Sequence, residues 1–435
     1  MITLLQELHP QTTTIQISSD VTTHVTLDAP FINLSETITV DPGVTLYTID
    51  SSLRESSTKI SFKAIRVRSD EPISIHVIDD TTPDVGGYLA LPVESLGTEY
   101  MIMSFKPQGK SELLISSISD TTKVYVHLNT KSNVTYLGQT YSSGDVIRET
   151  LNTFRTWQIT SSDDLTGTVI KADGLITVMS GSDCGQVPET SMACGYIVEQ
   201  LPTVTSWDTV YIVPLSSTCS NVVRVISRDD DNSIRFTFNH RTWSTNLESS
   251  DFVDQSYSVQ TDQGPYVVVE ASRPILVAIL VGPSVGEDYQ SCGPSMTIVP
   301  GVNQYMNSYR VNVPTGLSKA VISVIVPATQ VSGLRLNNQP ISSSSLYHVS
   351  LNGTVEEYYV VDVDVVNEAG DVLLSHADLF DFGAIFRGER ANETFAFPLG
   401  MTLDLAEGNV VFVYSYYLVI LFISYFDIVQ MVCSI

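Results

Sequence analysis

One phrase of the sequence recurs along the chain at a spacing of about 100 residues. Its three clear copies are IRVRSDEPISIHV (Ile65–Val77), TVIKADGLITVMS (Thr168–Ser180) and YVVVEASRPILVAIL (Tyr266–Leu280). Each copy has an apolar run, a short polar break, and then Pro or Leu ahead of a second apolar run. The equivalent positions Pro72, Leu175 and Pro274 are 103 and 99 residues apart, and a degenerate fourth copy occupies Asp371–Gly388. A period of roughly 100 residues is the size of one β-sandwich module and much longer than a solenoid repeat.

The segments between these copies also alternate between apolar and polar residues, which is the pattern of half-buried β-strands. No stretch combines a sustained helical period with a cap at each end. We therefore predict an all-β fold of tandem antiparallel β-sandwich-like modules with few short helices. The predicted modules are residues 1–87, 88–197, 198–300 and 301–402, followed by a hydrophobic tail at 403–435. Within the second copy, Thr166–Gly181 predicts a β-hairpin that turns at Ala172-Asp173-Gly174.

Composition excludes some functions and favours others. The 435 residues carry a formal net charge of −26, and only 16% of them are charged. Nucleic acid is excluded as a partner because its phosphate backbone requires a basic face. The acidity itself indicates no more than solubility. The low share of charged residues suits an extracellular β protein, and no sequence pattern calls for a cofactor.

A family resemblance is carried by DLTGTVIKADGLITVMSGSDCGQVPETSMACGYIVEQLP, residues Asp164–Pro202. This run resembles the N-terminal domain of IgGFc-binding proteins, a secreted mucus and cell-surface family. The resemblance covers Tyr88–Pro314 well and extends more loosely to Met401. It implies a non-enzymatic, secreted or surface-displayed adhesion or recognition protein with glycoprotein or mucin partners, in mucosal or innate immune defence. It does not imply that antibody is a ligand. The alternative function is a lectin-like carbohydrate-binding module that uses exposed aromatic side chains.

Four of the five cysteines, Cys184, Cys194, Cys219 and Cys292, cluster in the resembling region. Four cysteines allow three connectivities. The resemblance implies a Cys184–Cys194 disulfide, which the loop-like residues between them also favour, and Cys219–Cys292 then follows, leaving Cys433 free. A zinc site is the competing interpretation, but no Cys-x-x-Cys pair or nearby His pair supports it. Disulfides imply an oxidising compartment.

Four N-glycosylation sequons agree with that compartment. They begin at Asn33, Asn133, Asn352 and Asn392. The first residues, MITLLQELHP, do not form a signal peptide, so we expect the natural leader to be missing from this chain, with a cytosolic protein as the alternative. The tail segment Val410–Phe426 is 17 uncharged residues, just short of a bilayer span. A membrane anchor, a gene-model artefact and buried strands all remain open for it.

Chemical motifs are few. Gly282-Pro283-Ser284-Val285-Gly286 matches the nucleophile elbow of hydrolases, but no helical pattern follows Ser284, so a serine hydrolase is only a remote alternative. The acidic run Asp229-Asp230-Asp231 lacks calcium-loop spacing and predicts a solvated hairpin turn. The seven histidines are scattered, and lone tryptophans in β-modules usually belong to the core. We therefore predict no catalytic or metal-binding residues.

Binding is expected on loops, because the strands of a β-module serve as scaffold. The two segments that differ most between the matching modules are Gly181–Gly195 and Arg241–Asp254. We predict that a ligand contacts the loop closed by Cys184 and Cys194, together with neighbouring inter-module surface. The predicted ligand-binding residues are Gln186, Glu189 and Thr190.

Overall fold

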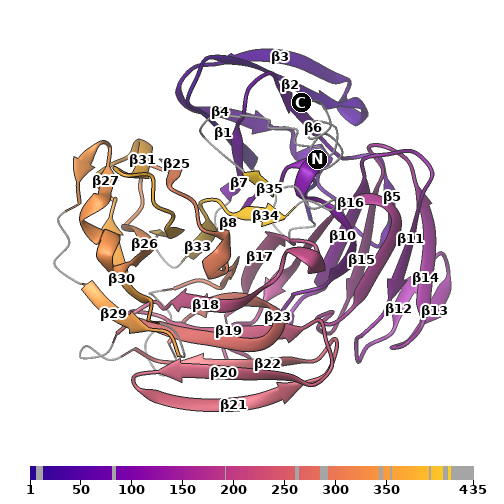
Figure 1. The fold of residues 1–435 in the computed structure, drawn as a ribbon. Coiled ribbons are helices and arrows are strands. Elements are labelled where there is room, and N and C mark those ends of the chain that lie inside the picture. The colour runs from indigo at the N-terminus through magenta and orange to yellow at the C-terminus, as the bar shows by residue number, and fades with distance from the viewer. Residues whose placement is uncertain are drawn as a thin grey trace, which may run out of the picture.

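The computed structural model describes residues 1–5, 13–80, 85–191, 193–259, 264–284, 292–341, 346–352, 355–390, 393–404 and 410–412. These residues form antiparallel β-sheets with six short 3-10 helices, so the all-β prediction is confirmed. Four groups of strands, here called the first to fourth modules, surround a common centre (Figure 1). The predicted module boundaries at residues 87 and 197 fall inside the strands β8 and β17.

The first module contains β1 (Thr13–Ser19), β2 (Thr23–Ala29), η1 (Pro30–Ile32), β3 (Leu34–Val40), β4 (Gly43–Ile49), η2 (Ser51–Leu53), β5 (Lys59–Ser61), β6 (Arg66–Ser69), β7 (Ser74–Asp80) and β8 (Val85–Leu89). The second contains η3 (Val93–Ser95), β9 (Gly97–Met101), β10 (Ser111–Ser117), β11 (Thr122–His127), β12 (Val134–Tyr136), β13 (Gln139–Tyr141), β14 (Val146–Leu151), β15 (Thr156–Ser161), β16 (Val169–Gly185) and β17 (Gly195–Gln200).

The third module contains η4 (Val204–Ser206), β18 (Asp208–Pro214), β19 (Ser220–Ser227), β20 (Asn232–Phe238), β21 (Arg241–Leu247), β22 (Phe252–Tyr257), β23 (Tyr266–Gly282) and β24 (Ser295–Ile298). The fourth contains η5 (Val302–Gln304), β25 (Ser308–Val313), β26 (Lys319–Pro327), η6 (Ala328–Gly333), β27 (Leu334–Leu336), β28 (Gln339–Pro340), β29 (Leu346–Ser350), β30 (Glu357–Asp364), β31 (Gly370–His376), β32 (Gly383–Arg390) and β33 (Glu393–Pro398). A last pair follows, β34 (Thr402–Asp404) and β35 (Val410–Phe412).

The hairpin predicted for Thr166–Gly181 is wrong, because this region is one continuous strand, β16. Its first part pairs with β11 and β9, and its second part pairs with β10 and β17. The polar break is the point where the strand passes from one set of partners to the other. There the carboxylate of Asp173 accepts a 2.7 Å hydrogen bond from the backbone N–H of Lys123. At the matching position in β23, the Ser272 hydroxyl accepts a 2.9 Å hydrogen bond from the backbone N–H of Ser233.

The turns predicted from local sequence are confirmed. Asp229–Asp231 connects β19 to β20, and Asp231 has a φ of 51°. In the second module Thr121 occupies the matching turn with a φ of 58°. Asp is one of the few residues besides Gly that tolerate this left-handed conformation, which is why it marks turns, whereas the conformation is unusual for the β-branched Thr121.

Four strands, one from each module, line the centre of the molecule. β8 contacts β17, β17 contacts β24, β24 contacts β33, and β33 contacts β8, so the inner strands form a closed ring. The approach is close: a Cβ on Gly86 would lie 2.6 Å from a ring carbon of Tyr196. β8, β17 and β24 each lead into a turn that starts the next module, which gives the arrangement seen in Figure 1.

A buried tyrosine fixes three of these turns in the same way. The Tyr100 hydroxyl accepts from the N–H of Gly97 (2.9 Å) and donates to the carbonyl of Ile176 (2.8 Å). Tyr211 does the same between Asp208 (2.9 Å) and Ile275 (2.6 Å). Tyr309 does it between Met306 (3.0 Å) and Phe382. Tyr100 and Tyr211 tie the start of their modules to the long strands β16 and β23, and Tyr309 ties its module's start to the residue directly before β32.

The hydrophobic cores cross module boundaries. The largest cluster combines second-module residues with Val222, Leu276 and Met296 of the third module. The first-module core likewise includes Tyr196 and Val198 from β17. Within the described residues, no helix is long and apolar enough to cross a membrane. Residues 413–435, which hold most of the predicted tail and Cys433, lie outside the described residues.

Candidate functional site

The predicted disulfides Cys184–Cys194 and Cys219–Cys292 are both present. β16 continues to Gly185, so the loop proper is shorter than the Gly181–Gly195 segment expected from sequence. Val187 in this loop is fully buried, and its carbonyl lies so close to Gly282 that a Cβ there would approach it to 2.0 Å. Only glycine permits that approach. The close contact packs this second-module loop directly against β23 of the third module.

Hydrogen bonds make this loop rigid. Gln186 donates a side-chain amide N–H to the backbone carbonyl of Ser191. Its backbone N–H donates to the carbonyl of Lys106 at 3.0 Å, and Ser191 N–H donates to Pro188 at 2.8 Å. Glu189 and Thr190 are exposed at the tip. Two of the three predicted binding residues therefore face solvent, while the side chain of Gln186 holds the loop in shape.

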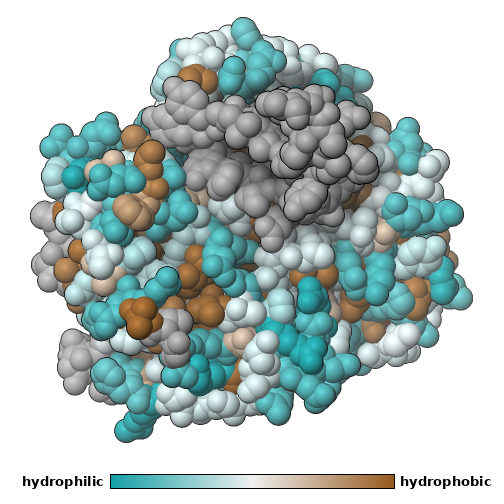
Figure 2. Space-filling model, in the orientation of Figure 1, coloured by the Kyte–Doolittle hydropathy of each residue, from teal (hydrophilic) through white to brown (hydrophobic). Residues whose placement is uncertain are grey.

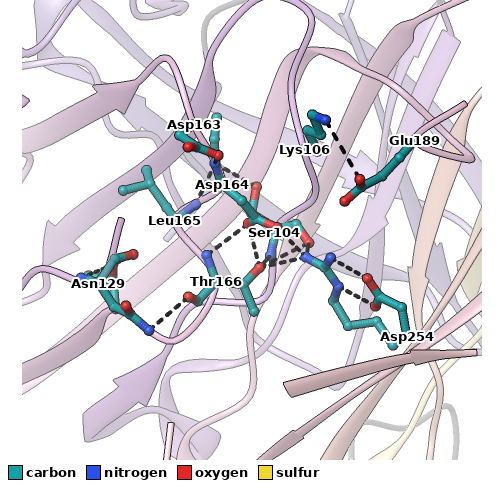
Figure 3. Close-up of polar contacts among 12 residues, drawn as sticks. Ser104, Lys106, Asn129, Asp163, Asp164, Leu165, Thr166, Glu189 and Asp254 are labelled. Atoms are coloured by element: carbon teal, nitrogen blue, oxygen red, sulfur yellow. Dashed lines mark hydrogen bonds and ion pairs between the residues drawn. The ribbon is translucent and has the colours of Figure 1, made fainter. Parts of the chain in front are cut away.

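A groove of about 660 Å³ lies beside this loop, where the second module meets the third. Its walls come from loops at one end of the second module and from the first residue of β22. The lining residues are Lys106, Asn129, Thr130, Lys131, Asn133, Ser142, Ser143, Asp163, Asp164, Thr166, Glu189 and Phe252. Figure 3 shows how Lys106 and Glu189 lie together on one side, with Asn129 and Thr166 on another.

Arg224 of β19 forms the support beneath the groove. It is 1% exposed, and its guanidinium lies between the rings of Phe105 and Phe252, 4.5 and 4.3 Å from their centroids. It donates two 2.7 Å hydrogen bonds to the carboxylate of Asp254, which is the fork geometry that suits a carboxylate. One nitrogen crosses to the second module (Figure 3), where it donates to Asp164 (2.5 Å), the Ser104 carbonyl (2.8 Å) and the Thr166 hydroxyl (2.8 Å).

Charge is nearly balanced in the groove, in contrast to the chain as a whole. Burial acts to lower the pKa of Arg224, but the carboxylates of Asp164 and Asp254 outweigh it and raise that pKa above its usual value. Lys106 faces Glu189 at 3.6 Å, with both side chains about half exposed. Among the lining residues, Lys106 and Lys131 stand against Asp163, Asp164 and Glu189, and the buried Arg224 beneath them pairs with both Asp164 and Asp254. A groove of this kind suits an uncharged polar ligand better than a polyanion or a polycation.

The other candidate residues do not assemble into a chemical site. The half-buried Ser284 has a 3.5 Å hydrogen bond from its hydroxyl to the carbonyl of Thr218, and Gly286 lies outside the described residues. Trp157 and Trp207 are buried in the core, and Trp243 stacks on Phe236. Among the described residues, no group of His, Cys, Asp and Glu could hold a metal ion. Arg241–Asp254 is not a loop as predicted, because β21 and β22 occupy most of it.

The predicted glycosylation sites have different surroundings. Asn33 is exposed at the end of η1 with a φ of 55°, and Asn352 is exposed in the fourth module. Asn133 is exposed and lines the groove. Asn392 lies outside the described residues.

Most groove residues could not be predicted from the sequence because they come from six separate segments. One signal was present: Asp164 and Thr166 belong to the DLTGT run on which the family resemblance rests. The sequence predicts the start of a strand there, whereas in the structure Asp164 is one of the second-module partners of Arg224. Phe252 gave no signal, because a single Phe at the start of a strand is ordinary.

Comparison with known proteins identifies the family. A family model described as "IgGFc binding protein" matches residues 86–388. The chain belongs to this family. The human IgGFc-binding protein is 28% identical to it over 320 residues, which is 72% of this chain but only 6% of the human protein. The match therefore spans a small part of that relative.

A solved structure is also similar in overall extent. It is described as a Ca²⁺-stabilized adhesin that helps an Antarctic bacterium reach out and bind ice, and it is 12% identical to this chain. The alignment covers 93% of this chain and 92% of that one, with a TM-score of 0.11. At that score the likeness carries no argument about fold or function.

On the face shown in Figure 2, this family member is mostly hydrophilic with scattered small hydrophobic groups.

Proposed function

We propose that this IgGFc-binding family member is a non-enzymatic extracellular binding protein that contacts a glycoprotein or mucin-type partner at the groove between its second and third modules. The observation that supports this proposal most directly is the rigid polar groove, which lies above Arg224 and beside the Cys184–Cys194 loop. A preformed site loses little conformational entropy when it binds. The two disulfides support an extracellular location.

Direct recognition of a saccharide is the second candidate, and Phe252 favours it. Its ring is 37% exposed at the groove while Arg224 lies under it. The other walls offer amide and hydroxyl groups from Asn129, Thr130 and Ser143. An aromatic face beside several polar groups suits a ligand that has both C–H and hydroxyl faces, as sugars do. The groove volume is within the roughly 300–1,000 Å³ of small-ligand sites, so it would take a short oligosaccharide.

An array of mucins, serum glycoproteins, purified Fc and released glycans tests both candidates. The variants are Lys131→Ala and the double change Glu189→Ala with Thr190→Ala, and Lys123→Ala on β11 is the matched exposed control. We expect the groove variants to bind at least about tenfold more weakly, a change of about 1.4 kcal/mol. The control should match the wild type.

The outcomes separate the possibilities. Binding of intact glycoproteins without released glycans would favour protein contacts, and binding of released glycans would favour the lectin. Normal binding by both groove variants, together with loss of binding on changes near Asn352, would place the site in the fourth module and overturn the proposal. Replacing Ser284 with Ala should leave binding unchanged, because its hydroxyl only bonds the Thr218 carbonyl.

A further inference from the structure

We infer that Asn133 carries an N-linked glycan that lies in the groove and covers it. Asn133-Val134-Thr135 is a complete sequon, and Asn133 and Thr135 are both exposed. Asn133 is itself part of the groove wall, together with Lys106, Lys131 and Phe252. The first sugar attached there would start inside the site. This goes beyond the proposed function, because the protein's own modification would compete with a partner for the groove.

The local structure is compatible with attachment. Asn133 directly precedes β12, which pairs only with β13 in a separate two-stranded sheet. Its side-chain oxygen Oδ1 accepts a 3.1 Å hydrogen bond from the Ser142 hydroxyl. A glycan joins the other amide atom, Nδ2, so this bond can persist after modification. It would hold the asparagine against the wall and fix where the glycan begins.

Two features favour the glycan over bulk solvent as the groove's occupant. The inner sugars of N-linked glycans are uncharged, which suits a groove whose lining sets two lysines against three carboxylates, one of which also pairs with the buried Arg224. Phe252 is the only aromatic residue among the lining residues, and it is partly exposed. The C–H face of a sugar can pack against its ring.

Tethering supplies the rest of the affinity. A covalently attached ligand on a short flexible link has an effective concentration in the millimolar range. A saccharide whose intrinsic Kd is about 1 mM would then occupy the groove about half of the time. Weak affinity, which would be of little use for a free sugar, is therefore enough for the attached one.

The test uses the full chain secreted from cells that attach N-glycans. Mass spectrometry first measures occupancy at Asn133, and an amine-reactive reagent then measures acylation rates of lysines. We expect Lys106 and Lys131 to react at least about twofold more slowly in the glycosylated protein than in Thr135→Val, which keeps Asn133 but destroys the sequon. Enzymatic removal of glycans from the wild type should produce the same increase.

Two controls make the result specific. Lys123, exposed in the same module but away from the groove, should react equally in every form. Asn33→Asp removes a sequon in the first module, at a residue in left-handed conformation that Asp tolerates, and should leave Lys106 and Lys131 unchanged. An unmodified Asn133, or a modified one with no protection of these two lysines, would overturn the inference. Because the measurement needs no partner, its outcome does not depend on whether the groove binds a glycoprotein.

Discussion

Arg224 joins the second and third modules through hydrogen bonds, ion pairs and ring contacts. Its charge is buried between Phe105 and Phe252 and is shared by Asp164 and Asp254. Removing one member of such a group leaves carboxylates without their buried partner, which typically costs about 3–5 kcal/mol. We expect Arg224→Ala to reduce the free energy of unfolding by that amount, measured by urea denaturation.

The matched control is Arg68→Ala on β6. Arg68 is 60% exposed and pairs with Asp28 at 3.1 Å. Exposed ion pairs contribute roughly 0–1 kcal/mol, so this variant should unfold almost as the wild type does. If the two arginine variants lose equal stability, Arg224 does not hold the modules together as argued.

His76 should make stability depend on pH. It is fully buried on β7, where its Nε2 donates to the Leu399 carbonyl at 3.2 Å, and burial lowers its pKa from 6.5 to about 4. The unfolded chain therefore takes up this proton more readily than the folded one between these values, and stability falls as pH decreases through that window. The difference of roughly 2.5 in pKa corresponds to about 3 kcal/mol at the acid end.

Denaturant midpoints measured between about pH 7.5 and pH 4 check this effect of His76. His76→Gln should flatten the acid side of the curve relative to the wild type. Burial raises the pKa of Glu199, so the folded protein binds this proton more tightly than the unfolded chain does. The effect of Glu199 on stability is therefore opposite to that of His76, because it favours the folded state at low pH and is lost as pH rises. Glu199 is present in both proteins, so it cancels in the comparison. Parallel curves for wild type and variant would contradict the assignment to His76.

At the scale of elements, the three tyrosine turns should be equally important. Tyr211→Phe removes a buried hydroxyl and leaves the N–H of Asp208 and the carbonyl of Ile275 without their partner. A buried polar group left unpaired costs about 1–3 kcal/mol. Tyr100→Phe and Tyr309→Phe should behave alike in thermal or urea unfolding. Tyr141→Phe is the control, because its hydroxyl bonds Gln139 at the surface.

The Cys184–Cys194 loop permits a second element-scale prediction. Closing a loop of this length should stabilise the chain by roughly 2–3 kcal/mol, so the double change to Ser should lower the free energy of unfolding by that amount. Limited proteolysis should then cleave near the exposed Glu189 and Thr190. Non-reducing peptide mapping of the wild type should find two disulfides and free Cys433. Five free thiols would contradict both the pairing and the extracellular location.

What could be predicted from sequence was set by local chemistry. Strand alternation and turn residues act over a few positions, so the turn at Asp231 and the all-β fold were predictable. From the sequence, the polar break at Asp173 could mark either a turn or a point where one strand changes its pairing partner, because both produce a short polar interruption between two apolar runs. Deciding between them requires the position of Lys123, 50 residues away. The groove was less predictable still, since Arg224 and Asp164 meet across 60 residues.

At the scale of the whole molecule, the first and fourth modules complete the ring. The side-chain amide of Gln16 donates to the Asn312 carbonyl at 2.9 Å and accepts from the Asn312 N–H at 3.1 Å. Arg310 reaches Asp20 at 3.3 Å. These contacts join residues about 290 positions apart, and β33 lies against β8. A sequence that predicts tandem modules contains no local sign of this closure.

We expect removal of β33 to weaken the first module. A chain ending at residue 392 would leave β8 without the neighbour that covers Gly87 through Phe397. Amide hydrogen exchange should be at least about tenfold faster in β8, since local opening follows the loss of buried contacts. Exchange in β20 and β21, on the opposite side of the ring, should stay slow. Unchanged protection of β8 would show that ring closure adds nothing to its stability.

The closed ring also restricts how such a protein can evolve. A linear array of modules can gain or lose a copy by duplication or deletion, because only neighbouring copies touch and the ends are free. Here the inner strand of every module has a neighbour on both sides, so an inserted fifth copy would separate β33 from β8 and change the curvature at every junction. Copy number within this unit should be fixed, and diversification should proceed through its loops or by multiplication of the whole ring.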